Sequence, residues 1–294
     1  MMHSDFNYIS SHIQRDIEHK LHAGGILCRV FGRGKSNISI EKKLQTTIIE
    51  NDLQTLKYTN AGRKIQDAVG IRVVLYFSDD IEIVQNILNK HYNCLHEDST
   101  IDKHEKEIFC VTRYNLIYTI PKLHNADFLH GVGGKAIDCT FEVQLRTVLS
   151  EGWHEVEHDL RYKQKQHWEG QNELSRSLNG ILASLESSEW GMRKIFEELA
   201  YKHYKKKCWE AMLSLKFRLR IQGGLDENLN ALLNGDTITA KKILKLDRSH
   251  FLYTYMDRYN TLPLTMDNIV YISNIITESS QAIMNITPSI IKNM

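Results

Sequence analysis

Three polar side chains with complementary chemistry alternate with apolar ones in one short segment. Glu142, Gln144 and Arg146 occupy every second position of this segment. The apolar residues that alternate with them are Phe141, Val143 and Leu145. Successive side chains of a β-strand point to opposite faces, so we expect the acid, the amide and the guanidinium group on one face. Such a surface can bind a metal ion, take up a proton and hold a phosphate group.

The hydrophobic period changes from two to three or four directly after this segment, at Thr147. The apolar residues that follow at helical spacing are Leu149, Trp153, Val156 and Leu160. This spacing predicts an amphipathic helix that follows the strand without a loop.

The segment from Phe141 to Lys163 resembles the signature of the RelA/SpoT-type nucleotide pyrophosphokinases, which make the alarmones ppGpp and pppGpp. That family carries Glu-[Val/Ile]-Gln-[Leu/Ile]-Arg-Thr on a strand, and then a helix with Trp, Glu-His and Tyr-Lys at fixed spacing. The matching positions are Glu142, Gln144, Arg146, Thr147, Trp153, Glu157, His158, Tyr162 and Lys163. The resemblance covers residues 25–165. It implies an enzyme that transfers the β,γ-diphosphate of ATP to the 3′-hydroxyl of GDP or GTP.

The predicted helix also contains the sequence HEVEH at residues 154–158, which fits the H-E-x-x-H pattern of zinc proteases. A zinc protease needs a third ligand, and it has no use for the polar strand that precedes this helix. A chance match is common in a chain with 14 histidines among 294 residues. A zinc metalloprotease is therefore the minor alternative.

Basic and hydroxyl side chains cluster at the turn between a predicted strand and a predicted helix within residues 26–44. Positive charge at the start of a helix suits phosphate binding, although a solvated basic turn has the same composition. By the resemblance, Arg33 stacks on the adenine of ATP. The residues that would hold the ATP phosphates are Lys35, Ser39 and Lys43.

An acidic residue, Asp67, stands at the beginning of the predicted strand 65–77. Its position alone allows either a metal ligand or a residue that caps a loop. The resemblance makes Asp67 and Glu142 the catalytic pair that holds Mg²⁺. It makes Arg72 the second plate around adenine, because a planar guanidinium group can stack on a base.

The acceptor side matches the family less closely than the donor side. By the resemblance, Tyr114 and Gln144 place the acceptor, while Arg146 and His158 support the site. The glycine, the basic residue and the histidine that accompany this tyrosine in the family are absent here, and Glu151 stands where one branch has asparagine.

This departure motivates an alternative acceptor, the 3′ end of tRNA, as in a toxin-type relative. Residues 201–220 are rich in lysine and arginine with interleaved aromatic residues, a composition that can hold an RNA end. A helix with a solvated lysine face has the same composition. A further alternative is a nucleotide-binding module without catalytic activity.

The composition is that of an ordinary globular chain, with 42% hydrophobic and 25% charged residues and a net charge of +1. Five cysteines are scattered without a C-x-x-C pair, which favours a reducing, cytoplasmic location. No apolar run is long enough to predict a signal segment or a membrane span. We expect no membrane partner, and we leave open a homo-oligomer formed through C-terminal helices and an antitoxin partner.

The fold class predicted is α+β, with a nucleotidyltransferase-like mixed β-sheet of about five strands flanked by helices. The predicted domains are a synthetase domain at residues 1–200 and a helical C-terminal extension at residues 201–294. Residues 50–60 are expected to be helical or looped, and residues 124–135 to form a hairpin loop because of their glycines.

Overall fold

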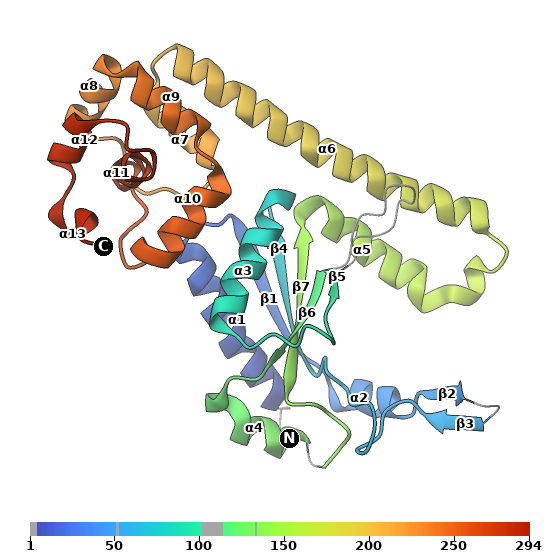
Figure 1. The fold of residues 1–294 in the computed structure, drawn as a ribbon. Helices are drawn as coiled ribbons and strands as arrows, with labels where there is room; N and C mark the ends of the chain where they lie inside the picture. Colours follow the sequence, from blue (N-terminus) through green and yellow to red (C-terminus); the bar gives the residue numbers. More distant parts are fainter. Residues whose placement is uncertain (1–4, 51–52, 102–113, 133) are drawn as a thin grey trace. The chain divides into compact units, whose positions relative to one another are not determined.

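The computed structural model describes residues 5–50, 53–101, 114–132 and 134–294 (Figure 1). The chain divides into two compact units. The first is formed by the chain up to His19, by Cys28–Leu75 and by Leu88–Ala183, and the second by Lys20–Leu27, Tyr76–Ile87 and Ser184–Met294. Helices α1 (Asp5–Ala23), α3 (Ile81–His91) and α6 (Asn172–Lys205) contribute residues to both units. The domain boundary expected at residue 200 stays a prediction.

A mixed five-stranded sheet forms the centre of the first unit, in the order β1-β4-β7-β6-β5 (Figure 1). The strands are β1 (Cys28–Gly34), β4 (Val69–Leu75), β7 (Thr140–Thr147), β6 (Tyr114–Thr119) and β5 (Thr100–Ile101). Strands β4 and β7 run parallel, and the other neighbours are antiparallel. The predicted mixed sheet with flanking helices and a helical C-terminal part is confirmed.

One face of this sheet is apolar and covered by helices. The apolar stripe of α1 is fully or almost fully buried, as its spacing predicts, and it consists of Phe6, Ile9, Ile13, Ile17 and Leu21. Phe6 packs against Phe128 of α4 (Asn125–Val132), with ring centroids 5.4 Å apart. Tyr118 stacks on Phe141 within the sheet at 5.5 Å. Burial of such aromatic side chains stabilises the packing of the helices on one another and of neighbouring strands.

Helix α1 also protects the free edge of the sheet. Asn7 accepts a hydrogen bond of 2.9 Å from the backbone N–H of Gly34, and Gln14 accepts one of 2.9 Å from that of Gly32. The Gln14 amide donates to the carbonyl of Val30 at 2.9 Å. An unpaired edge strand is a template for aggregation, and these side chains occupy the exposed backbone groups of β1.

Strand β7 passes into helix α5 (Val148–Leu160) with no residue between them. Thr147 ends the strand and caps the helix, and its side chain accepts from the N–H of Ser150 while Ser150 accepts from the N–H of Thr147. Such a reciprocal cap satisfies two helix N–H groups and fixes the direction of the helix. Trp153 is buried, and its indole N–H donates to the carbonyl of Leu178 at 2.8 Å. The predicted change of period at Thr147 is therefore confirmed.

Two local expectations are wrong. Residues 47–56 contain strands β2 (Thr47–Glu50) and β3 (Leu53–Leu56), which pair antiparallel, where a helix or loop was expected at 50–60. The consecutive β-branched residues at positions 46–49 favour a strand there, because β-branched side chains suit extended backbone. Residues 125–132 form helix α4 and not a hairpin loop. The buried side chains of Phe128 and Val132 stabilise this helix despite the nearby glycines.

The remaining elements of the first unit are short. They are α2 (Asn37–Leu44) and the 3₁₀ helices η2 (Lys122–His124) and η3 (Tyr162–Trp168). Residues 102–113, which contain the first half of the strand expected at 109–120, lie outside the described residues.

The second unit is helical. Its elements besides parts of α1, α3 and α6 are η1 (Ser78–Asp80), α7 (Trp209–Phe217), α8 (Glu227–Gly235), α9 (Thr237–Lys245), α10 (Arg248–Thr254), η4 (Tyr255–Tyr259), α11 (Met266–Thr277), α12 (Gln281–Ile286) and α13 (Ser289–Lys292). Side-chain caps begin most of the later helices, and they are Asp226, Asp236, Asp247, Thr265 and Ser280. Each cap satisfies N–H groups that a short helix would leave unpaired.

Two ion pairs, of which the one at Asp80 is buried on both sides, tie η1 to the helices of the second unit. Arg218 donates to Asp79 at 2.5 Å, and Arg248 donates to Asp80 at 2.5 Å and to the carbonyl of Phe217. Asp80 is fully buried. Breaking such a pair leaves an uncompensated charge in the interior, so these contacts hold the unit in one arrangement. Among the described residues, no helix is long and apolar enough to cross a membrane.

Candidate active site

The face of the sheet opposite the aromatic cluster is polar at its centre. In the parallel ladder Glu142 lies level with Gly70 and Gln144 lies level with Arg72. On the other side of β4, Arg33 of β1 pairs with Gly70. A side chain at Gly70 would meet only the carbonyl of Arg33, at 3.7 Å, so the row between Arg33 and Glu142 is open. The register therefore places residues from three neighbouring strands on one face of the sheet.

An acidic residue at the start of β4, Asp67, forms the centre of a charged cluster. Lys43 of α2 lies with its ammonium nitrogen 2.8 Å from both carboxylate oxygens, and Lys35 donates to one of them. Lys35 follows β1 directly, and its backbone N–H donates to the carbonyl of Ala68 at 2.8 Å. Thr140 donates to the carbonyl of Gln66 at 2.9 Å, which fixes the segment before β4 against the start of β7.

The pKa values in this cluster follow from burial and from the paired charges. Burial alone would raise the pKa of Asp67, but the ammonium groups of Lys35 and Lys43 outweigh it and hold that pKa below its ordinary range. Burial lowers the pKa of Lys35 despite its contact with Asp67. For Lys43 the opposite holds, because the attraction of Asp67 exceeds the effect of burial and raises the pKa. Asp67 is therefore an anion held between two cations.

Glu142 lies within electrostatic reach of this cluster. Burial and the negative charge of Asp67 raise the pKa of Glu142, against the effects of Gln144, Lys35 and Lys43. The amide of Gln144 donates to the Glu142 carboxylate at 3.0 Å and so orients it. A carboxylate with a raised pKa is a better proton acceptor than an ordinary one. The two predicted acids thus lie close enough to affect each other's charge, with the pKa of Asp67 lowered and that of Glu142 raised.

The side chains of Asp67 and Glu142 are of the chemical kind that binds magnesium. Magnesium prefers oxygen ligands, and it typically takes one or two protein carboxylates together with water and substrate phosphates. In the described parts of the chain, no group of three or more histidine, cysteine, aspartate or glutamate side chains could hold a metal. The donor set therefore suits an ion whose shell is completed by a phosphate-bearing ligand.

The guanidinium group of Arg72 is held by two acids of helix α5. It donates to Glu151 at 2.5 Å and to Glu155. Burial would lower the pKa of Arg72, but the two carboxylates raise it. One oxygen of Glu151 is buried, with no hydrogen-bond partner within the described structure. Glu155 is the glutamate of the H-E-x-x-H pattern. In this structure that glutamate is paired with an arginine.

The other residues expected on the donor side lie at the surface. Arg33 and Ser39 are exposed, and Ser39 lies in the first turn of α2. The N–H of Ser39 donates to the capping oxygen of Ser36 at 3.3 Å, and the two hydroxyl groups are 3.0 Å apart. An N-terminal turn with exposed hydroxyl groups can accept a phosphate oxygen.

The acceptor residues do not form one surface. Tyr114 lies level with Leu145, whereas Gln144 lies level with Asn115, so Tyr114 and Gln144 point to opposite faces of the sheet. Arg146 is buried and donates to Asn115 at 3.4 Å.

His158 is exposed near the end of α5, where it contacts Asp159 at 3.0 Å and stacks on Tyr162 at 5.7 Å. The roles expected for Tyr114, Gln144, Arg146 and His158 stay predictions.

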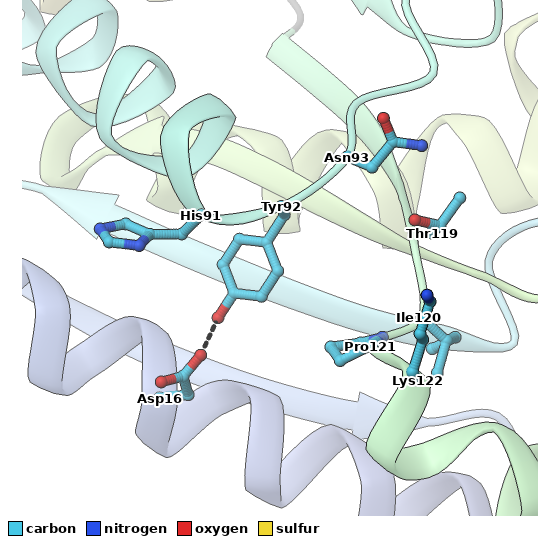
Figure 2. A pocket seen from close by; sticks show the side chains of 8 residues that line it. All are labelled: Asp16, His91, Tyr92, Asn93, Thr119, Ile120, Pro121 and Lys122. Carbon is cyan, nitrogen blue, oxygen red and sulfur yellow. Dashed lines mark hydrogen bonds between the residues drawn. The ribbon is translucent and has the colours of Figure 1, made fainter.

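A hollow of about 280 Å³ lies on the other side of the sheet (Figure 2). Tyr92 lines it and donates its hydroxyl hydrogen to Asp16, and the Tyr92 ring packs on Phe141 at 5.3 Å. Because Phe141 belongs to the apolar face, this hollow is separated from Glu142 by the sheet. Burial and the neighbouring Asp16 carboxylate raise the pKa of Tyr92, so its hydroxyl stays protonated.

Two features of the site were missed from the sequence. One is the pairing of Asp67 with two lysines. The only feature of the sequence that indicated it was the group of basic residues near residue 40. The other is the pairing of Arg72 with α5. Glu151 and Glu155 are four residues apart on a helix, and that spacing places both carboxylates on one face.

Residues 32–167 match the family model described as "Region found in RelA / SpoT proteins". The matched segment is a little less than half of the chain. A curated relative, GTP pyrophosphokinase YjbM of Bacillus subtilis (strain 168), is 29% identical over 137 residues, which are 46% of this chain and 56% of the relative. The chain therefore spans little more than half the length of that relative.

Solved structures of small alarmone synthetase 1 from Bacillus subtilis are also similar to this chain. The structure without a named ligand is 19% identical with a TM-score of 0.46, and it covers 66% of this chain and 95% of its own. The structure bound to its product pppGpp is 20% identical with a TM-score of 0.48, and the shares are 67% and 95%. The charged cluster from Lys35 to Gln144 lies entirely within the RelA/SpoT region.

Proposed function

We propose that this chain is a pyrophosphokinase that transfers the β,γ-diphosphate of ATP to the 3′-hydroxyl of GDP or GTP. The observation that carries the proposal is the cluster at Asp67, where two lysines and a second carboxylate meet inside a RelA/SpoT region. Lysines bind phosphates, and paired carboxylates bind the ion that accompanies a triphosphate. The name of the YjbM relative, a GTP pyrophosphokinase, supports a guanosine nucleotide as acceptor.

The donor nucleotide is bound by residues of β1, α2 and β4. Lys35 and Lys43 neutralise the β- and γ-phosphates, and Ser39 donates its hydroxyl hydrogen to a phosphate oxygen. The guanidinium groups of Arg33 and Arg72 stack on the two faces of adenine. Both groups belong to the same face of the sheet, since Arg33 is level with Gly70 and Arg72 lies two residues further along β4.

Glu142 takes the proton in the transfer step. The acceptor 3′-oxygen bonds to the β-phosphorus of ATP, the bond from that phosphorus to the α,β-bridging oxygen breaks, and AMP leaves with this oxygen. The hydroxyl hydrogen passes to the Glu142 carboxylate, which acts as the general base. Asp67 and Glu142 would hold a magnesium ion, which would neutralise charge that develops on the phosphates. Gln144 orients Glu142 and, on the same face of the sheet, is assigned to the acceptor.

A tRNA 3′ end is the second acceptor to be tested. The basic stretch at residues 201–220 motivates it, although part of this charge is engaged internally. Arg218 pairs with Asp79 and Lys207 donates to the carbonyl of Asn234, while Lys205 lies over the ring of Tyr201 at 5.8 Å. A stacked lysine and tyrosine can bind an unpaired base, so these two residues are the specific observation.

The deciding experiment supplies the purified chain with ATP labelled at the γ-phosphate and with GDP, GTP or tRNA in separate reactions. Label on the guanosine nucleotide, with release of unlabelled AMP, is the expected result. Label on tRNA would show that the acceptor is tRNA and that the diphosphate transfer itself is as proposed. Absence of AMP release with all three, together with no binding of ATP, would remove the proposal and leave a non-catalytic module.

A further inference from the structure

The metal carboxylate at the centre of the candidate site is already occupied by cations of the protein. Lys43 contacts both oxygens of Asp67 at 2.8 Å, and Lys35 contacts one of them. The side chains of Lys35, Lys43 and Asp67 are only 16%, 29% and 25% exposed, so water screens these charges weakly. A divalent ion bound to Asp67 would lie next to two ammonium groups.

We propose that Lys35 and Lys43 keep Asp67 closed to a divalent cation until a polyphosphate draws the two ammonium groups away, so that the nucleotide completes the magnesium site. The inference rests on the proposed function for the nature of the nucleotide. The ion needs a carboxylate oxygen at about 2.0–2.1 Å, and Lys43 and Lys35 occupy both oxygens of Asp67. Lysine is suited to such an exchange, because its charge sits at the end of a flexible chain.

The second carboxylate supports the same conclusion. Glu142 is near enough to Asp67 to feel its charge, and it is also near enough to be attracted by both lysines. Two ammonium groups therefore face two carboxyl groups in the absence of a ligand. A triphosphate brings several negative charges to the same place, and the lysines then have a competing partner. Metal and nucleotide affinities should consequently be coupled, each raising the other by the same factor.

The experiment measures binding of Mn²⁺, as a magnetic substitute for Mg²⁺, by electron paramagnetic resonance and calorimetry. The first arm contains no nucleotide. Mn²⁺ should bind the unaltered chain weakly, and Lys43→Gln should tighten binding by about tenfold or more, within the usual range of such couplings. The double variant Lys35→Gln/Lys43→Gln should tighten it further, and adding Asp67→Asn should abolish the gain.

The matched control is Lys42→Gln. Lys42 is the neighbouring residue on α2, it is exposed, and its loss changes the net charge by the same amount. Its Mn²⁺ affinity should stay within about twofold of the unaltered chain, because long-range charge effects at the surface are screened. Circular dichroism confirms that each variant is folded. Equal Mn²⁺ affinities for Lys43→Gln, the double variant and the unaltered chain would overturn the inference.

The second arm uses α,β-methylene ATP, which cannot transfer its diphosphate. It should bind the unaltered chain in the presence of a chelator, and Lys43→Gln should weaken that binding. Failure of this analogue to bind with or without Mn²⁺ would reject the proposed donor and leave the nucleotide-free titrations to decide the lysine effect. An increase in Mn²⁺ affinity without analogue binding would therefore separate the two claims.

Discussion

The substitution Glu142→Gln tests both the chemistry and the electrostatics of the site. It keeps the size and the hydrogen-bonding oxygen of the side chain and removes its charge and basicity. Loss of a general base typically slows a reaction by 10²- to 10⁴-fold, which corresponds to about 3–5 kcal/mol in the barrier. We expect a loss of this size in the release of AMP from ATP with a guanosine acceptor, measured by chromatography. Binding of α,β-methylene ATP in the presence of a chelator should be nearly unchanged by this substitution.

The same substitution should stabilise the fold. Glu142 has a pKa raised by burial and by Asp67, whereas in the unfolded chain it ionises near about 4.3. Between these two pKa values the native state binds more protons than the unfolded state, so stability falls as pH rises through this window. Above the native pKa the whole penalty is present. Glutamine carries no such penalty.

The expected gain is about 1 kcal/mol at pH 8, a usual size for removing a strained charge from an active site. For a unit of this size that gain corresponds to an increase in Tm of about 2–4 °C. At pH 5 the gain should be smaller, because part of the penalty is absent there. Differential scanning calorimetry at both pH values measures it.

Glu41→Gln is the control for this prediction. It makes the same chemical change at an exposed site on α2, where the nearest cation is Lys135 at 3.5 Å. Turnover and Tm should change little, as expected for surface pairs. Turnover of Glu142→Gln within tenfold of the unaltered chain would refute the role as base. A gain in Tm over the unaltered chain that is smaller at pH 8 than at pH 5 would refute the electrostatic reasoning.

Three further predictions concern the neighbouring structure. Arg72→Lys should raise KM for ATP about 2- to 30-fold, the value of a lost cation–π stack, and an unchanged KM would place adenine elsewhere. Gly34→Ala should lower stability by about 1–3 kcal/mol, because its Cβ would lie 2.5 Å from α1 backbone, whereas Gly152→Ala has open space and should stabilise α5 in thermal melts. Arg248→Met should cost about 3–5 kcal/mol in urea unfolding by leaving Asp80 buried and unpaired, and adding Asp80→Leu should recover most of it.

The sequence predicts those parts of the site that depend on periodicity along one element. Alternation in β7 separates Glu142 and Gln144 from Phe141, and the change of period at Thr147 marks the start of α5. Contacts between elements leave no such trace. The pairing of Arg72 with Glu151 and the pairing of Asp67 with Lys43 depend on how β4, α2 and α5 pack.

Distance in the chain explains another part that the sequence does not reveal. The ion pair between Asp80 and Arg248 joins residues 168 positions apart. The sequence around either residue does not predict this partner. The β2–β3 hairpin and helix α4 were missed for a different reason. The β-branched side chains of β2 favour a strand but stand beside polar residues, and helix α4 depends on the burial of Phe128 and Val132, which the sequence alone does not show.

The direct junction of β7 and α5 leaves the chain no slack at this point. Thr147 serves as the last residue of one element and the cap of the next, so an inserted residue would rotate α5 by about 100° and turn Glu151 away from Arg72. Inserted residues should therefore be tolerated in exposed connections, such as residues 169–171 between η3 and α6, and rejected here. A scan of single-residue insertions along residues 140–160, scored by soluble yield, would map this rigid joint.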